Sequence, residues 1–227
     1  MPWKDWSLGT KISIHTSFAL IVLGMVLFYF IEHNNTMKEL STFESIIASF
    51  FQSVTTRTAG FNTLDFGQFL PSTLIFMIFL MFIGASSGST GGGIKTSTFL
   101  LILVSAIATI RGKKNVDLGK RHISNDLLFK AFSIFAFAAF YNLVMIFALS
   151  ISDPDINILQ LFFEQVSAFA TVGLSTGITS DLSLVGKIII IVSMFIGRIG
   201  TLTLALAIST RVESTNYRYP NAHLLIG

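Results

Sequence analysis

Two short glycine-containing loops carry the residues best suited to chemistry in this chain of 227 residues. The first loop is Thr58, Ala59, Gly60, Phe61 and Asn62, and the second is Thr171, Val172, Gly173, Leu174 and Ser175. Glycine reaches positive φ at little steric cost, so neighbouring carbonyl groups can point the same way. Rings of such carbonyls replace the hydration shell of a monovalent cation such as K⁺ in a selectivity filter. The alternative interpretation is that both loops are tight turns between helices.

A glycine-rich run over residues 84–98 is the second candidate for a functional segment. Its glycines and its one charged residue are Gly84, Gly88, Gly91, Gly92, Gly93 and Lys95. Each glycine costs a helix about 1 kcal/mol relative to alanine, so the run predicts a break that could act as a gate. It does not match a nucleotide-binding loop, because Ile94 stands where that motif needs lysine.

Arg198 lies in the middle of the last apolar stretch of the chain. An arginine at mid-bilayer costs at least about 2.5 kcal/mol, so it normally faces a cavity or a partner. We expect Arg198 to hydrogen-bond carbonyls freed in the 84–98 run, or to place a positive charge that hinders cation flow until the gate rearranges. A purely architectural role, satisfying loop carbonyls, is the alternative.

The composition indicates a membrane protein and gives little support to an enzyme. Hydrophobic residues make up 52% of the chain and charged residues only 12%, about half the usual share for a soluble domain. The sequence has no cysteine, no HExxH motif, no evident pair of catalytic carboxylates and no evident Ser/His/Asp arrangement. We therefore expect no catalytic residue and no cofactor.

Apolar stretches long enough to cross a bilayer must position these loops. They cover residues 12–31, 131–152 and 188–210, and a fourth, 66–110, is a crossing broken by the glycine-rich run. Two shorter stretches, 45–56 and 165–180, end in the glycine loops and suggest re-entrant segments. The expected fold is an all-α membrane protein with two span–pore-helix–span repeats, in which the second span of the first repeat is broken.

An internal offset of 113 residues supports this duplication. Gly60 aligns with Gly173, and the tetrapeptide Met-Phe-Ile-Gly at 81–84 recurs at 194–197. The offset divides the chain into a first unit, 1–112, a basic connection, 113–130, and a second unit, 131–227. Membrane transporters often place binding sites at the interface between such repeats.

The charges predict an orientation in the cell membrane. The two ends of the chain and the 113–130 connection with its flank hold ten basic and four acidic residues, whereas the opposite side holds three basic and eight acidic ones. The basic side is expected to be cytoplasmic, so that both termini lie inside and both glycine loops enter the membrane from outside. A cytoplasmic rim next to the lipid bilayer explains the basic connection better than nucleic-acid binding does.

Four stretches of the chain resemble the Trk/Ktr/HKT superfamily of potassium transporters, and within it the KtrB-like membrane subunits. They are residues 56–63, 88–95, 170–175 and 197–200. The resemblance implies that Gly60 and Gly173 are filter glycines, that 84–98 is an intramembrane gating loop and that Arg198 is its neighbour. It also implies a homodimer with cytoplasmic nucleotide-binding subunits of the RCK type.

The family fold has four such units around one pore, and this chain matches units three and four. Two loops cannot enclose a fourfold filter, so we expect a missing N-terminal half or a second chain to complete the pore. The predicted function is a K⁺ transporter subunit, with Na⁺ as the other candidate ion. A non-conducting membrane scaffold or partner subunit that needs another chain is the alternative.

Overall fold

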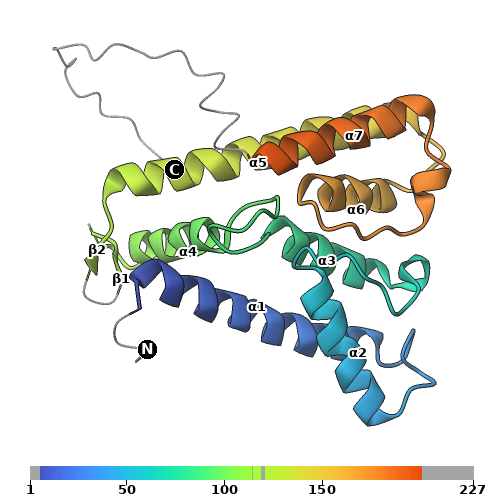
Figure 1. Ribbon diagram of the computed structural model, residues 1–227, viewed down its shortest axis with the longest axis horizontal. Helices are drawn as coiled ribbons and strands as arrows, with labels where there is room; N and C mark the ends of the chain where they lie inside the picture. Colours follow the sequence, from blue (N-terminus) through green and yellow to red (C-terminus); the bar gives the residue numbers. More distant parts are fainter. Residues whose placement is uncertain (1–5, 114, 119–120, 201–227) are drawn as a thin grey trace.

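The computed structural model describes residues 6–113, 115–118 and 121–200, and this part of the chain is almost entirely helical. Two of its helices, α1 (Leu8–Glu32) and α5 (Asn125–Ser152), are long and apolar enough to cross a membrane. They lie at opposite edges of the molecule in Figure 1, with the shorter helices between and beside them. The expected all-helical class is therefore confirmed at this coarse level.

The remaining elements are shorter. In chain order they are α2 (Thr42–Thr55), the 3₁₀ turn η2 (Phe66–Gln68), α3 (Pro71–Phe82), α4 (Thr96–Ile110), β1 (Asp117–Leu118), β2 (Arg121–His122), α6 (Ile158–Phe169), the 3₁₀ turn η3 (Ile178–Ser180) and α7 (Leu184–Ile199). A long helix, a short helix, a loop with a 3₁₀ turn and another helix thus follow one another twice.

Local sequence signals set the helix starts. The Ser7 hydroxyl accepts a hydrogen bond from the Thr10 amide at the start of α1. Ser41 and Glu44 form a reciprocal capping box that begins α2. Pro71 opens α3, where its missing N–H costs nothing because the first helical amides have no partner within the helix.

Asp153 ties the end of α5 to the start of α7. Its carboxylate accepts hydrogen bonds from the Ser183 amide at 2.6 Å and from the Ser152 hydroxyl at 2.5 Å. Burial by itself raises the pKa of Asp153, but these hydrogen bonds outweigh it and lower the pKa below its ordinary value. The acidic side chain thus fixes the turn between the two helices.

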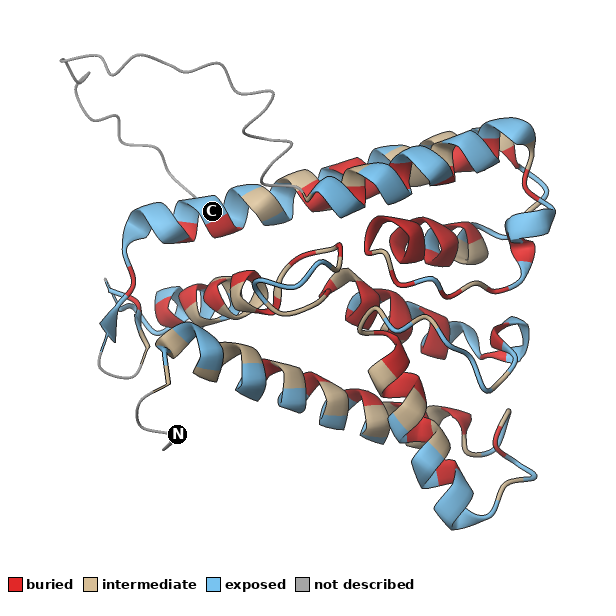
Figure 2. Ribbon diagram, viewed as in Figure 1, coloured by how far each residue is buried: buried red, intermediate tan, exposed pale blue. Residues whose placement is uncertain are grey.

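The short helix α6 is the most enclosed element of the described chain. It packs against α3, α5 and α7, and Figure 2 shows it buried over most of its surface. The other short helix, α2, packs on α1 and leaves an apolar face exposed. The two short helices therefore have different surroundings although they occupy equivalent places in the chain.

The boundaries differ from the sequence expectations in three places. Helix α6 covers 158–169, so it begins seven residues before the stretch 165–180, because Glu164 is buried inside the helix and does not mark its edge. Helix α5 begins six residues before 131, with Asp126 in its first turn, where an acidic side chain suits the helix dipole. The basic connection 113–130 accordingly contains the antiparallel pair of β1 and β2 and the first six residues of α5.

The stretch 66–110 is interrupted between two helices. Helices α3 and α4 occupy the two ends of the stretch 66–110, and non-helical chain joins them at the centre of Figure 1. The last expected crossing, 188–210, is described only to residue 200, where α7 covers 184–199. Residues 201–210 lie outside the described part.

Candidate functional site

The two glycine loops meet each other in the structure. A Cβ atom on Gly60 would collide with the carbonyl oxygen of Val172 and lie 3.4 Å from its carbonyl carbon. A Cβ on Gly173 would in turn lie 3.6 Å from the Cα of Gly60. The tight approach at Gly60 explains why this loop has no side chain there, and it brings together residues 113 positions apart.

Both loops have the same unusual backbone geometry. Thr58 and Thr171 have φ values of 66° and 56°, which residues with a Cβ rarely adopt, and Gly60 and Gly173 follow at 75° and 90°. Each loop directly follows the C-terminal end of a short helix, α2 or α6, which carries a partial negative charge. Such strained backbone is typical of functional sites.

A hydroxyl group of each short helix holds its loop. Thr55 donates a hydrogen bond to the carbonyl of Phe61 at 2.5 Å, and Ser167 donates one to the carbonyl of Leu174 at 2.6 Å. These two carbonyls therefore point back toward the helices. The side chains differ, because Phe61 is 70% exposed whereas Leu174 is buried.

The glycine-rich run folds back along itself between α3 and α4. The Ile94 amide donates to the Phe82 carbonyl at 3.1 Å, and the Thr96 amide donates to the Ala85 carbonyl at 3.3 Å. Ile83 and Ile94 form an isolated parallel bridge. The run is thus an ordered loop that returns the chain to the C-terminal end of α3.

This loop contacts both candidate filter loops. The Gly92 amide donates to the Thr171 hydroxyl at 2.7 Å, and a Cβ on Gly92 would lie 2.6 Å from the Phe169 carbonyl oxygen. A Cβ on Gly91 would lie 3.2 Å from the side chain of Thr58. Three segments that are far apart in sequence therefore form one site.

Three basic side chains bind backbone carbonyls of the glycine-rich loop. Arg198 donates to the Thr90 carbonyl at 2.5 Å, so the hydrogen bond expected from the sequence is present. Lys95 donates to the carbonyls of Gly91 at 2.6 Å and Ser89 at 3.0 Å. Arg57 donates to the Gly84 carbonyl at 3.1 Å.

The role of Arg57 was missed by the sequence analysis, which counted it among the charges of the outer side. Its guanidinium is half-buried and also contacts the Ser17 hydroxyl at 3.3 Å. Its place beside Thr58, at the end of a short apolar stretch, is the signal that could have indicated a contact with the broken crossing.

The predicted site residues differ in how deeply they are buried in this site. Gly84 and Gly92 are buried, and Gly93 is half-buried with a φ of 69°. Gly88 lies exposed at the tip of the run with open space around it. In the first loop Ala59 and Asn62 are exposed.

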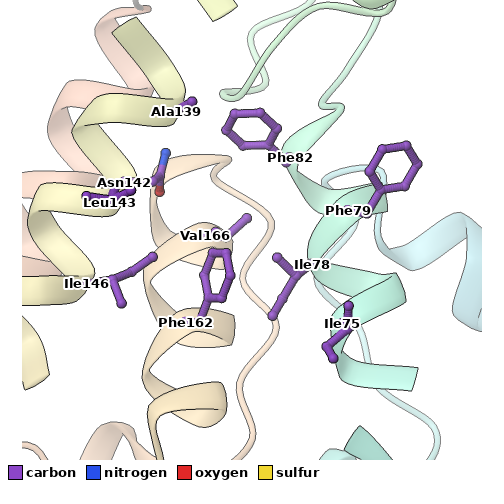
Figure 3. A pocket seen from close by; sticks show the side chains of 10 residues that line it. All are labelled: Ile75, Ile78, Phe79, Phe82, Ala139, Asn142, Leu143, Ile146, Phe162 and Val166. Atoms are coloured by element: carbon purple, nitrogen blue, oxygen red, sulfur yellow. The ribbon is translucent and has the colours of Figure 1, made fainter. Parts of the chain in front are cut away.

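Two cavities differ sharply in chemistry. A cavity of about 390 Å³ beside the glycine-rich loop is about half polar and lined by Ser89, Thr90, Lys95 and Arg198 among others. A larger one, about 530 Å³, lies between α3, α5 and α6 and is lined by apolar side chains apart from Asn142 (Figure 3). The Asn142 nitrogen donates to the Ala138 carbonyl and its oxygen accepts from Gln165 at 3.4 Å, so this apolar cavity has little to offer a dehydrated cation.

Comparison with known proteins decides the family. A model of the family described as TrkH, cation transport protein, matches residues 8–219. The chain belongs to this family. The family is one of cation transport proteins and not of enzymes.

Individual members of the family show how much of a complete protein this chain represents. The Ktr system potassium uptake protein B of Bacillus subtilis is 43% identical over 99% of this chain and 51% of its own length. The potassium/sodium uptake protein NtpJ of Enterococcus hirae is 35% identical over the same shares. The crystal structure of the potassium transporter TrkH from Vibrio parahaemolyticus aligns with a TM-score of 0.72 at 20% identity, over 87% of this chain and 44% of that one. The chain spans about half the length of these relatives.

Proposed function

We propose that this chain forms half of a K⁺-conducting pore, in which the two glycine loops supply part of a carbonyl filter. The meeting of Gly60 and Gly173, each with positive φ after a short helix, is the observation that carries this proposal. Rings of backbone carbonyls replace the hydration shell of K⁺ in such filters. The carbonyls of Phe61 and Leu174 serve as anchors, since both already accept hydrogen bonds from the helices.

The glycine-rich loop acts as the gate in this proposal. It lies against Thr58 and Thr171, and Arg57, Lys95 and Arg198 hold its carbonyls. A loop fixed by discrete hydrogen bonds can adopt a second arrangement when those bonds are exchanged. Movement of this loop would open or close the path beneath the filter.

A second half is needed to enclose the ion. Two loops cover part of a ring, and relatives named for potassium uptake are about twice as long as this chain. The partner is either an N-terminal half or another chain of similar architecture. The complete subunit would pair as a homodimer and carry RCK-type regulatory subunits on its basic inner face. Na⁺ is the second candidate ion, because NtpJ is named for both potassium and sodium uptake.

The test is potassium uptake in a bacterium that lacks its own uptake systems. This chain joined to the N-terminal half of the Bacillus subtilis relative should restore growth at low K⁺, whereas the chain alone should not. Gly173→Asp in the joined protein should abolish uptake, because a side chain at φ +90° distorts the loop.

Gly9→Ala is the matched control, because Gly9 lies in α1 far from both loops and has room for a methyl group. It should leave uptake unchanged. A joined protein that reaches the membrane but takes up no K⁺ would support the alternative of a non-conducting scaffold. Immunoblotting of the membrane fraction separates that outcome from poor expression.

A further inference from the structure

A buried carboxyl group lies directly behind the second glycine loop. Glu164 is in the middle of α6, and only 5% of its surface is exposed. Its carboxyl group accepts hydrogen bonds from the hydroxyls of Ser175 and Thr179, the latter at 3.3 Å, and from the Thr176 amide. Among the described residues it forms no salt bridge. Burying a carboxyl group costs free energy unless it is hydrogen-bonded, and here all of its hydrogen bonds within the described chain come from one loop. This arrangement requires an explanation.

These contacts all go to the segment that follows Gly173. Ser175 is the last residue of the candidate filter stretch, and Thr179 lies in the 3₁₀ turn η3 beyond it. The Ser175 hydroxyl also accepts from the Gly177 amide at 2.9 Å and lies 3.0 Å from the Thr179 hydroxyl. One carboxyl group thus links the helix, the end of the loop and the turn that leads to α7.

The first loop has no equivalent carboxyl group behind it. By the offset of 113, the residue equivalent to Glu164 is Phe51, which has no hydrogen-bonding group. There the neighbouring Gln52 instead donates to the Thr63 hydroxyl at 3.1 Å. The two loops are therefore held by different chemistry although their backbone conformations match.

We propose that Glu164 is a positioning residue that holds the second loop in its ion-binding conformation through Ser175 and Thr179. This inference rests on the proposed function of the loop. A cavity of about 420 Å³ between α6 and α7 adjoins this contact and is lined by Glu164, Gly173, Ser175 and Arg198, among others. The carboxyl group therefore lies between the proposed filter and the helix that carries the gate arginine.

The transport experiment compares variants in the joined protein defined above. Glu164→Leu removes every hydrogen bond of the carboxyl group and should raise the KM for K⁺ uptake roughly tenfold while weakening discrimination against Na⁺. Glu164→Gln keeps an acceptor oxygen and should stay within about threefold of the parent KM. Thr179→Val removes one donor and should fall between them.

A second measurement detects release of the loop without relying on transport. This chain has no cysteine, so Ile178→Cys introduces a single thiol, at a position that is 8% exposed, once any cysteine of the joined N-terminal half has been replaced by serine. A soluble maleimide should label this thiol slowly in the parent and with Glu164→Gln, but at least about tenfold faster with Glu164→Leu. Glu44→Gln changes an exposed carboxyl group at the start of α2 and is the control that should alter neither readout.

The outcomes separate this inference from the proposed function. Unchanged labelling with Glu164→Leu overturns the positioning role. It is also overturned if Glu164→Leu lowers uptake only by lowering the amount of protein, while the KM and the Na⁺ discrimination stay at the parental values. If Glu164→Gln is as impaired as Glu164→Leu, hydrogen bonding is not what matters and the inference is also wrong. Faster labelling in a joined protein that never transports K⁺ supports the loop contact and contradicts the proposed function.

Discussion

Hydrogen bonds from basic side chains to backbone carbonyls dominate the candidate site at the scale of single residues. Arg198 and Arg57 reach the glycine-rich loop from opposite units of the chain and bind the carbonyls of Thr90 and Gly84. A guanidinium has five donors in a fixed plane and stays charged, so it suits carbonyls left free by a broken helix. The loop is therefore held from both sides.

We predict that Arg198→Ala changes the rate of K⁺ uptake by the joined protein roughly tenfold or more, because a charged hydrogen bond to the gate is lost. The loop should favour its open arrangement, so the rate should rise. Uptake of labelled Rb⁺ into cells measures this change.

Lys187→Ala provides the matched control for Arg198. Lys187 is an exposed basic residue of the same helix and donates to the Ser180 carbonyl, away from the glycine-rich loop. Its removal should leave the uptake rate unaltered. Equal rates for Arg198→Ala and the parent would eliminate the gating role and leave Arg198 as an architectural residue.

At the scale of elements, glycines allow helices and loops to approach more closely than side chains permit. A Cβ on Gly197 would collide with the Phe169 carbonyl oxygen and lie 2.7 Å from its carbonyl carbon. Helix α7 therefore touches the end of α6 just where the second loop begins. The Met-Phe-Ile-Gly repeat noted in the sequence thus ends in a packing glycine in its second copy.

We predict that Gly197→Ala destabilises the protein by at least about 1–3 kcal/mol, because the colliding atom belongs to the backbone and cannot rotate away. Gly9→Ala, with nothing nearer than 4.0 Å to the added carbon, should change stability by no more than about 0.5 kcal/mol. The fraction of monodisperse protein that remains after heating in detergent compares the stability of each variant with that of the parent. Equal thermal stability for the two variants would show that α7 does not approach α6 this closely.

At the scale of the whole molecule, the charge asymmetry predicts how the chain crosses the membrane. The connection between α4 and α5 carries basic residues, whereas Asp153 and Asp155 lie at the other end of α5. Because α5 is long and apolar enough to span the bilayer, we expect these two ends to lie on opposite sides. The basic end is the cytoplasmic one in our proposal.

Single cysteines test this orientation, since the chain has none of its own. Lys113→Cys and Asp155→Cys both replace exposed residues. A membrane-impermeant thiol reagent added to intact cells should label the cysteine at 155 and not the one at 113. Permeabilised cells should allow both to react, which provides the control. Labelling at 113 in intact cells would reverse the proposed orientation.

Much of the element order could be predicted because it depends on local patterns. Charge-free stretches mark α1 and α5, and the glycine density at 84–98 marks the break between α3 and α4. The position of α6 could not be predicted in this way. Buried Glu164 interrupts the apolar pattern, and hydroxyl groups and an amide of the following loop satisfy it.

The sequence by itself determined the family resemblance, the duplicated loops and their spacing of 113 residues, because these reside in residue types and their order. Only the tertiary structure decided that Gly60 faces Val172, that Arg57 reaches Gly84 and that Glu164 is hydrogen-bonded to Ser175. Each of these contacts joins residues that no local pattern relates. They form because buried carbonyls, guanidinium groups and carboxyl groups must find partners wherever the packed helices bring them within reach.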